Sequence, residues 1–180
     1  MSLLFAPRQW LSIAAFCTAG LGAGLSPALA QDHSRENRIA TAVEIALPML
    51  AGYCAVKQGR GKEFAASFAV ETITVQGLKY GLGDAGINRR PNGGDRGFPS
   101  GHAALAMYGA TNLARKCLPQ KPVLGALAYG TALAVGASRI HTRHHNAGQV
   151  FSGLAIGYFA NGVSVGVGPG GMTMGFDMNF

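Results

Sequence analysis

Residues 138–149 read SRIHTRHHNAGQ and join two apolar segments of the chain. Three of the chain's five histidines fall in this stretch, together with two arginines. His141 and His145 are four residues apart, as are His145 and Gln149, so each pair shares a face if the stretch is helical. A histidine cluster first suggests a metal site. However, the stretch has no carboxylate or thiolate, and its arginines would repel a cation, so it favours an anion such as phosphate.

A second polar loop, residues 83–101, leads into the sequence Pro-Ser-Gly-His at positions 99–102. This pattern is typical of a helix start, because Ser is a good N-cap and Gly101 allows close approach of the backbone to another group. The first N–H groups of that helix would form an anion site beside His102. Taken alone, the pattern also fits an ordinary capped helix with an exposed histidine.

The two loops together predict chemistry on phosphate. A neutral histidine can attack phosphorus as a nucleophile, and a protonated one can give a proton to a leaving alkoxide. Arginine binds phosphate oxygens in pairs and keeps its charge at any physiological pH. Two histidines on separate loops with arginines around them therefore make a coherent site for phosphoryl transfer.

Five apolar segments dominated by Ala, Leu and Gly predict the fold. They cover approximately residues 39–55, 64–82, 102–114, 123–137 and 150–167. Their length and composition predict helices, although several are shorter than the roughly 20 residues that a membrane span needs. Those containing Glu71 and Asn112 are only weakly apolar. The chain is expected to be an all-α helical bundle, set in a membrane or, alternatively, soluble.

Composition limits the classes of partner. A chain of 180 residues is enough for one domain, and only 13% of it is charged, against about 25% in a typical soluble domain. The net charge of +7 suggests an anionic partner. Nucleic acid is the weaker interpretation, because the basic residues are scattered and are not interleaved with aromatic side chains. No obligate protein partner is inferred.

The two ends of the chain differ from its middle. Residues 1–30 have an early arginine, an apolar run and a final Ala-Leu-Ala, which predict a signal peptide or, alternatively, an uncleaved first helix. Residues 31–168 form the expected helical domain. Residues 169–180 form a Gly-rich tail that is expected to be irregular, although its alternating Met and Phe residues have the period of a strand.

Charge placement predicts a topology. The links near Lys57 and Lys116 are basic, which places them in the cytoplasm by the positive-inside rule. The two polar loops then face the periplasm of a bacterial inner membrane. Cys54 and Cys117 would lie on the cytoplasmic side as free thiols. In the alternative, a soluble periplasmic domain, the same thiols would be free to pair.

The sequence resembles the type 2 phosphatidic acid phosphatase and vanadium haloperoxidase superfamily. That family carries Lys-x6-Arg-Pro, then Pro-Ser-Gly-His, then Ser-Arg-x5-His-x3-Asp. The second motif is intact at residues 99–102, and the third runs from Ser138 to Gln149. The first is represented by Lys79 and Arg90, with ten residues between them instead of six. The three motifs in order are a much stronger signal than any one alone.

The resemblance implies a role for each matching residue. His145 corresponds to the nucleophile that takes the phosphoryl group, and His102 to the general acid that protonates the leaving oxygen. The groups that correspond to the phosphate-binding residues are Lys79, Arg90, Ser100, Gly101 and Arg139. The family fold is a helical bundle, and the resemblance implies neither a metal nor another cofactor.

Gln149 departs from the family pattern, which has an aspartate at this position. The amide can still accept a hydrogen bond from the ring of His145 but supplies no charge. We therefore expect a working orientation with a weaker nucleophile, and expect Gln149→Asp to be tolerated. Because Gln149 replaces the aspartate, the alternative is a protein that binds phosphate without catalysis. The longer first motif changes how Lys79 reaches the site.

The sequence thus predicts a metal-independent phosphatase that works through a phosphohistidine. Its expected substrate is a phosphate monoester or pyrophosphate on a lipid at the periplasmic face of the membrane. A soluble periplasmic acid phosphatase for small esters is the alternative. A vanadate-dependent haloperoxidase fits less well, because the chain is short for that chemistry.

Overall fold

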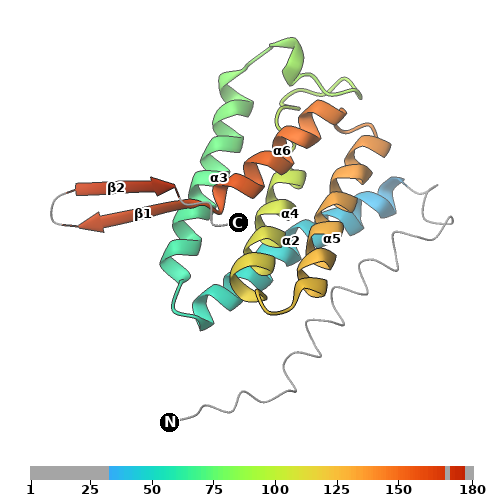
Figure 1. Ribbon diagram of the computed structural model, residues 1–180. Coiled ribbons are helices and arrows are strands. Elements are labelled where there is room, and N and C mark those ends of the chain that lie inside the picture. Colours follow the sequence, from blue (N-terminus) through green and yellow to red (C-terminus); the bar gives the residue numbers. More distant parts are fainter. Residues whose placement is uncertain (1–32, 169–170, 177–180) are drawn as a thin grey trace, which may run out of the picture.

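The computed structural model describes residues 33–168 and 171–176, whose main body is a bundle of five α-helices (Figure 1). The helices are α2 (His33–Lys57), α3 (Gly61–Gly81), α4 (Gly101–Asn112), α5 (Pro122–His141) and α6 (Ala147–Ala160). A 3-10 turn, η2 (Gly86–Asn88), lies in the loop before α4, and a π-helical turn, η3 (Leu113–Cys117), continues α4. The predicted all-α bundle is confirmed. The predicted export signal lies outside the described residues.

Helix α4 is the centre of the bundle, and α2, α5 and α6 pack around it (Figure 1). Nearly every residue from Ala103 to Asn112 is buried. The neighbouring helices approach closely because glycines face them: a Cβ on Gly157 of α6 would lie 2.1 Å from the carbonyl oxygen of Ala104. A Cβ on Gly109 would lie 2.4 Å from the backbone nitrogen of Pro48 in α2. Side chains at these glycines would push α2 and α6 off the central helix.

The two loops singled out by their chemistry meet at one end of the bundle (Figure 1). Helices α3 and α5 end there, and helices α4 and α6 begin there. The loop between α3 and α4 therefore lies beside the short link between α5 and α6. The other two links, residues 58–60 and 118–121, lie at the opposite end.

The C-terminal part forms a β-hairpin and not the irregular tail expected. Helix α6 ends at Ala160, so the apolar segment 150–167 is helical only in its first part. Strand β1 (Val163–Gly168) pairs antiparallel with β2 (Gly171–Phe176), with Val163 opposite Phe176. The apolar residues that alternate in the tail thus belong to β2. Its partner is the glycine-rich segment of β1, where β-branched Val alternates with Ser and Gly.

Cys54 and Cys117 form a disulfide, and the expectation of two free thiols is wrong. Cys54 lies near the end of α2 and Cys117 at the end of η3, with their Cα atoms 6.2 Å apart. Because 63 residues separate the two cysteines, the sequence does not indicate that α2 and η3 end at the same end of the bundle. The bond lies opposite the two functional loops. Disulfides persist in oxidising compartments and are rare in reducing ones.

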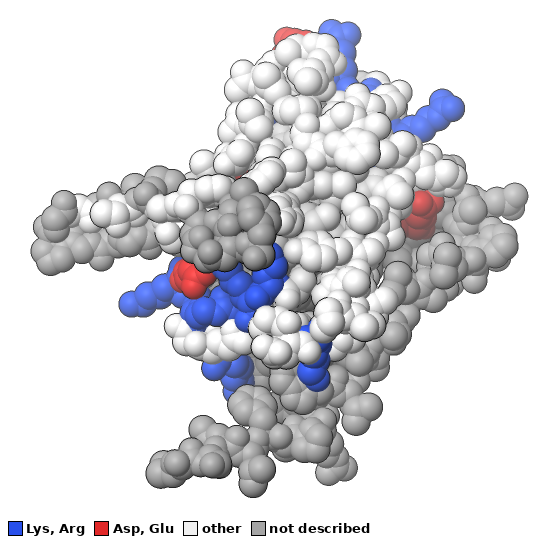
Figure 2. Space-filling model, viewed as in Figure 1, with Lys and Arg blue, Asp and Glu red and all other residues white. Residues whose placement is uncertain are grey.

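Charged side chains avoid the middle of the bundle. On the face shown in Figure 2, Lys and Arg gather toward the two ends, and the surface between them is largely uncharged. The acidic residues in the middle of the helices are Glu44 and Glu71, which are both buried. Residues Glu36–Lys57 and Pro122–His141 are long and apolar enough to cross a membrane, which supports membrane association weakly.

Replacing both cysteines by serine should lower the free energy of unfolding by about 2–5 kcal/mol, because the unfolded chain regains the entropy that the cross-link removed. Urea unfolding of the wild type and of the Cys54→Ser/Cys117→Ser variant measures the loss. Reductant should destabilise the wild type but not the variant, which makes the variant its own control. Rapid maleimide labelling of both cysteines in the native, unreduced protein would contradict the disulfide.

Candidate active site

Helix α4 begins at the predicted Pro-Ser-Gly-His sequence. Ser100 is its N-cap, and the buried Ser100 hydroxyl accepts a hydrogen bond from the N–H of Ala103 at 3.4 Å. The N–H of Ser100 donates to the carbonyl oxygen of Gln149 at 2.8 Å. His102 follows in the first turn and is partly exposed. The start of α4 is thus hydrogen-bonded directly to the first turn of α6.

His145 lies immediately before α6, whose N-cap is Asn146. Its ring is almost completely buried, with Nδ1 2.9 Å from the carbonyl oxygen of Gly97 and 3.2 Å from Oε1 of Gln149. Both neighbours are acceptors, so Nδ1 carries the proton and Nε2 keeps its lone pair. Burial, helped by the charges of Arg90 and Lys79, lowers the pKa of His145 to about 4. The imidazole is therefore neutral at pH 7.

Gln149 is fully buried and uses both ends of its amide. Its Nε2 donates to the carbonyl oxygens of Ile87 at 2.9 Å and Arg89 at 2.8 Å. Its Oε1 accepts from the N–H of Asn146 at 3.2 Å and faces His145. The two carbonyls fix which end of the amide is nitrogen, because a reversed amide would place oxygen against oxygen. Gln149 therefore attaches the α3–α4 loop to the predicted nucleophile.

Asn88 organises the same loop and was not identified from the sequence. It is buried, and its Nδ2 donates to the carbonyl oxygens of Lys79 at 3.0 Å and Gly83 at 2.8 Å. Its Oδ1 accepts from the N–H of Phe98 at 3.0 Å. The N–H of Gly97 donates to the backbone oxygen of Asn88 at 2.6 Å. One side chain thus joins the end of α3 to the segment that holds His145.

Gly97 must be glycine in this arrangement. A Cβ at this position would lie 2.6 Å from Nε2 of Gln149 and 3.0 Å from Cγ of Arg90. No side chain fits in that space without displacing the amide. The contact also shows that the side chain of Arg90 lies against the residue whose carbonyl oxygen orients His145.

Lys79 lies beside the first turn of α4 despite the longer loop that follows it. A Cβ on Gly101 would lie 3.7 Å from Cε of Lys79, and the ammonium donates to the carbonyl oxygen of Arg96 at 2.9 Å. Burial, and then the charge of Arg90, lowers the pKa of Lys79 to about 8. The extra loop residues are accommodated by η2 and by Asn88, and they do not move Lys79 away from the site.

Arg90 and Arg139 have hydrogen-bonding capacity that the protein does not use. Nε of each is buried and has no partner among the described residues. Nη1 of Arg139 donates to Oδ1 of Asn37 at 2.8 Å, which positions this guanidinium from α2. A buried, unpaired guanidinium N–H is costly unless an anion accepts from it. These donors match the oxygens of a phosphate group.

The predicted charged residues act together on His102. Burial first, and then the charges of Arg139, His145, Arg90 and Lys79, lower the pKa of His102 to about 3. Such mutual effects require these groups to lie close together. The structure thus brings together the eight residues predicted to form the site, namely Lys79, Arg90, Ser100, Gly101, His102, Arg139, His145 and Gln149.

Helix α2 supplies contacts that the motifs in the sequence do not predict. Besides Asn37, it places Glu36 Oε2 3.2 Å from Nδ1 of His141 and Glu44 Oε1 3.4 Å from Nε2 of His102. The signal for Glu44 was its position as a carboxylate inside an apolar helix. The signal for Asn37 was weaker, since a polar residue in the first turns of a helix is common.

The three histidines of residues 138–149 have different partners. His141 contacts Glu36, and Nδ1 of His144 lies 3.1 Å from the carbonyl oxygen of Thr142, whereas His145 faces Gly97 and Gln149. Within residues 33–168 and 171–176, no three His, Cys, Asp or Glu side chains are grouped so that they could hold a metal ion.

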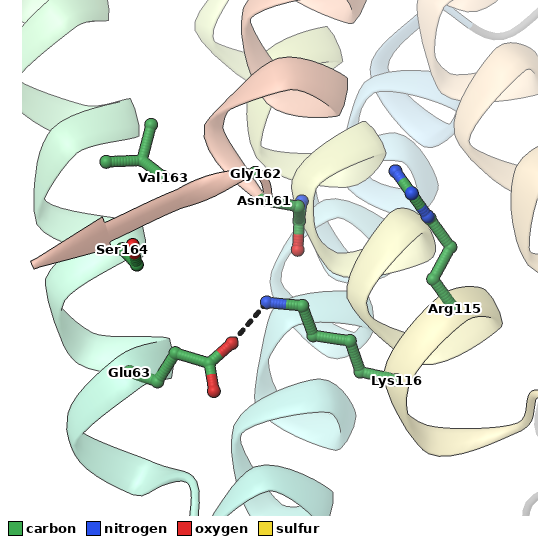
Figure 3. A pocket seen from close by; sticks show the side chains of 7 residues that line it. All are labelled: Glu63, Arg115, Lys116, Asn161, Gly162, Val163 and Ser164. Atoms are coloured by element: carbon green, nitrogen blue, oxygen red, sulfur yellow. Dashed lines mark hydrogen bonds and ion pairs between the residues drawn. The ribbon is translucent and has the colours of Figure 1, made fainter. Parts of the chain in front are cut away.

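A separate pocket of about 340 Å³ lies at the other end of the bundle, between η3, the start of α3 and the base of the hairpin (Figure 3). Lys116 forms an ion pair with Glu63 across it, and the other lining residues are Arg115, Asn161, Gly162, Val163 and Ser164. None of the predicted site residues lines this pocket. It is distinct from the histidine site.

Gln149→Asp, expected from the sequence to be tolerated, should instead destabilise the protein. The shorter carboxylate has no N–H to give to Ile87 and Arg89, and leaving buried carbonyls unpaired costs about 1–3 kcal/mol each. Gln149→Glu keeps the length but should lose the same two hydrogen bonds. Urea unfolding measures the loss, and ¹⁵N NMR of His145 shows whether Nδ1 still carries the proton.

The matched control is Gln120→Glu, which makes the same change at an exposed position. It should leave both readouts unchanged. A Gln149→Glu variant as stable as the wild type, with the same His145 tautomer, would show that the amide hydrogen bonds are unimportant.

Comparison with known proteins agrees with this geometry. The family model described as the PAP2 superfamily matches residues 57–167, which is more than half of the chain and includes all eight predicted site residues. The match leaves out all of α2 before Lys57. No curated protein and no solved structure matches the chain significantly. The resemblance inferred from the three motifs is confirmed, and the chain belongs to the PAP2 superfamily.

Proposed function

We propose that the chain is a metal-independent phosphatase that transfers the phosphoryl group of its substrate to His145 and then to water. Membership of the PAP2 superfamily supports phosphatase activity on phosphate esters. The observation that carries the finer proposal is the orientation of His145. Its Nδ1–H faces two acceptors, and its neutral Nε2 keeps the lone pair that a nucleophile needs.

In the first half-reaction, Nε2 of His145 attacks phosphorus, and the bond from phosphorus to the ester oxygen breaks. The bonding electrons go to the leaving oxygen, which receives a proton from His102. Arg90, Arg139 and the first-turn N–H groups of α4 stabilise the charge that develops on the phosphoryl oxygens. In the second half-reaction, water attacks the phosphohistidine, its proton passes to His102, and inorganic phosphate is released.

The donor set explains why no metal is needed in this proposal. The groups around the reacting position include two arginines and a lysine, which supply the positive charge that a metal would otherwise provide. They would also repel a divalent cation. No step in the proposed mechanism uses a metal ion.

His145→Ala should abolish phosphate release and the acid-labile, alkali-stable phosphoenzyme. His102→Ala should slow hydrolysis of alkyl phosphates by about 10²–10⁴-fold, the usual contribution of a general acid. The same variant should still form phosphoenzyme from an aryl phosphate with a good leaving group. Phosphate-release assays and rapid-quench labelling measure these effects.

His144→Ala is the matched control, because Nδ1 of His144 contacts Thr142 and the proposed mechanism gives His144 no role. It should keep nearly full activity, and EDTA should leave the wild type active. Full activity in His145→Ala would overturn the mechanism. So would loss of activity in EDTA with recovery on adding zinc.

The surface next to the site supports a lipid-linked substrate. Ile87 and Ile140 expose 53% and 40% of their surface: Ile87 lies in the loop that carries Arg90, and Ile140 directly follows Arg139. Tyr80 follows Lys79 and is 63% exposed, although the guanidinium of Arg96 lies over its ring. The charge-poor middle of the bundle and the two long apolar helices also favour contact with lipid. We propose that the phosphate group binds among the arginines while the apolar part of the substrate contacts these side chains.

A second candidate is a periplasmic phosphatase for small soluble esters, and the disulfide favours it. The disulfide and the site lie at opposite ends of the bundle, so a stable disulfide requires a non-reducing environment at the end that the charge pattern assigned to the cytoplasm. The whole bundle would then be exported, with neither end in the cytoplasm.

The two candidates differ in their dependence on the apolar side chains. With phosphatidic acid in detergent micelles, Ile87→Ser should raise KM by about threefold to tenfold, because it removes part of the apolar contact. With glycerol phosphate it should have no effect. Val123→Ser is the matched control, since Val123 is exposed at the other end of α5. Faster turnover of glycerol phosphate than of phosphatidic acid, together with release by osmotic shock, would favour the small-ester candidate.

A further inference from the structure

Glu44 is a buried carboxylate at the edge of the proposed site with an unusual position. It lies in α2, is only 7% exposed, and has Oε1 3.4 Å from Nε2 of His102. Its other oxygen, Oε2, is buried and has no hydrogen-bond partner among the described residues. Burying an ionised carboxylate with one oxygen unpaired is costly, so such a group tends to hold a proton instead.

The surroundings of His102 create a difficulty for a general acid. The charges that face it come from α3, from the α3–α4 loop, from α5 and from the link before α6, namely Lys79, Arg90, Arg139 and His145. With burial, they lower the pKa of His102 to about 3. In the protein without substrate, the ring is therefore neutral at pH 7 and lacks the second proton that a general acid gives to a leaving alkoxide.

The pKa of Glu44 is shifted in the opposite direction to that of His102. Burial raises the pKa of Glu44 to about 7, partly offset by the charge of Arg139. The two groups contact each other, so a proton held by Glu44 lies close to the ring of His102. While Glu44 is protonated, the pair holds one proton in addition to the one on the neutral ring.

We propose that Glu44 and His102 form a proton-sharing pair, in which Glu44 holds the proton that allows His102 to protonate the leaving oxygen. This rests on the proposed phosphatase mechanism. As the ester bond breaks, Nδ1–H of His102 gives its proton to the leaving oxygen, and Oε1–H of Glu44 gives its proton to Nε2. When water attacks the phosphohistidine, its proton passes to Nδ1, and the proton on Nε2 returns to Glu44. The enzyme thus ends each turnover in its starting state.

Glu44 acts through His102 and is therefore a positioning residue, not one that touches the substrate. The 3.4 Å contact is longer than a normal hydrogen bond, as catalytic contacts often are before substrate binds. Glu44 also lies outside the residues matched by the family model, so its role does not follow from membership of the superfamily.

The pair gives the pH profile a defined form. Above about pH 7, Glu44 has lost its proton, so turnover of esters with poor leaving groups should fall. Below about pH 4, His145 becomes protonated, so attack on every ester should fall. An ester with a good leaving group needs no proton and should show only the acidic limb.

Glu44→Gln tests the pair, because the amide keeps the size of the side chain but cannot pass a proton. At pH 7 the kcat for an alkyl phosphate should fall by about 10²-fold, and its alkaline limb should move to lower pH. The kcat for p-nitrophenyl phosphate should stay within about threefold. The matched control is Glu71→Gln: Glu71 is also buried and its pKa is also raised to about 7, but it contacts Thr72 and, among the described residues, no histidine. Glu71→Gln should leave the ratio of the kcat values for the two substrates unchanged.

Equal effects of Glu44→Gln on both substrates would overturn the pair and make Glu44 a structural residue. In a His102→Ala background, Glu44→Gln should cause no further loss, and a further tenfold loss for the alkyl ester would also overturn it. If Glu44→Gln does not fold, the pH profile of the wild type with the two substrates tests the pair instead. An alkaline limb near pH 7 for both substrates, or for neither, would contradict the pair. Activity in His145→Ala would instead mean that the proposed function itself fails.

Discussion

The side-chain amide of Gln149 is the constraint on which the site depends. Its oxygen faces the ring of His145, and its nitrogen binds two carbonyl oxygens of the α3–α4 loop. The same loop places the carbonyl oxygen of Gly97 against Nδ1 of the His145 ring. A single buried side chain thus fixes the tautomer of His145 and closes the loop around it. The superfamily pattern has an aspartate here, which could accept from His145 but could not donate to the loop.

The two departures from the family pattern meet in the structure. The loop of the longer first motif contains η2, and the carbonyl oxygens of Ile87 and Arg89, within and directly after η2, accept from the amide of Gln149. A neutral acceptor stabilises the imidazolium less than a carboxylate does. The low pKa of His145 is consistent with this, because burial and two cations act on it without a compensating negative charge. The proposed nucleophile is accordingly neutral over most of the physiological pH range.

Much of this arrangement could be predicted from the sequence, because the motifs name residues that carry the chemistry. The five helices and the grouping of His102, His145 and the arginines follow from apolar runs separated by two polar loops. Asn88 and Glu44 could not be found in this way, since their roles depend on which segments meet in space. The disulfide was missed for the same reason: the charge pattern suggested a cytoplasmic end, whereas the packing of α2 against η3 brings Cys54 to Cys117. The hairpin was missed because a glycine-rich segment gives little sign of its partner strand.

The central claim is that Nε2 of His145 carries the phosphoryl group. Rapid-quench trapping with an aryl phosphate, under alkaline conditions that preserve phosphohistidine, followed by peptide mapping, tests it directly. ³¹P NMR of the trapped protein then distinguishes the two ring nitrogens. We expect one phosphoryl group on the peptide that contains His145, attached to Nε2 because Nδ1 is held by Gly97 and Gln149. A phosphoryl group on Nδ1, on another residue, or on none during a measurable burst of product would contradict it.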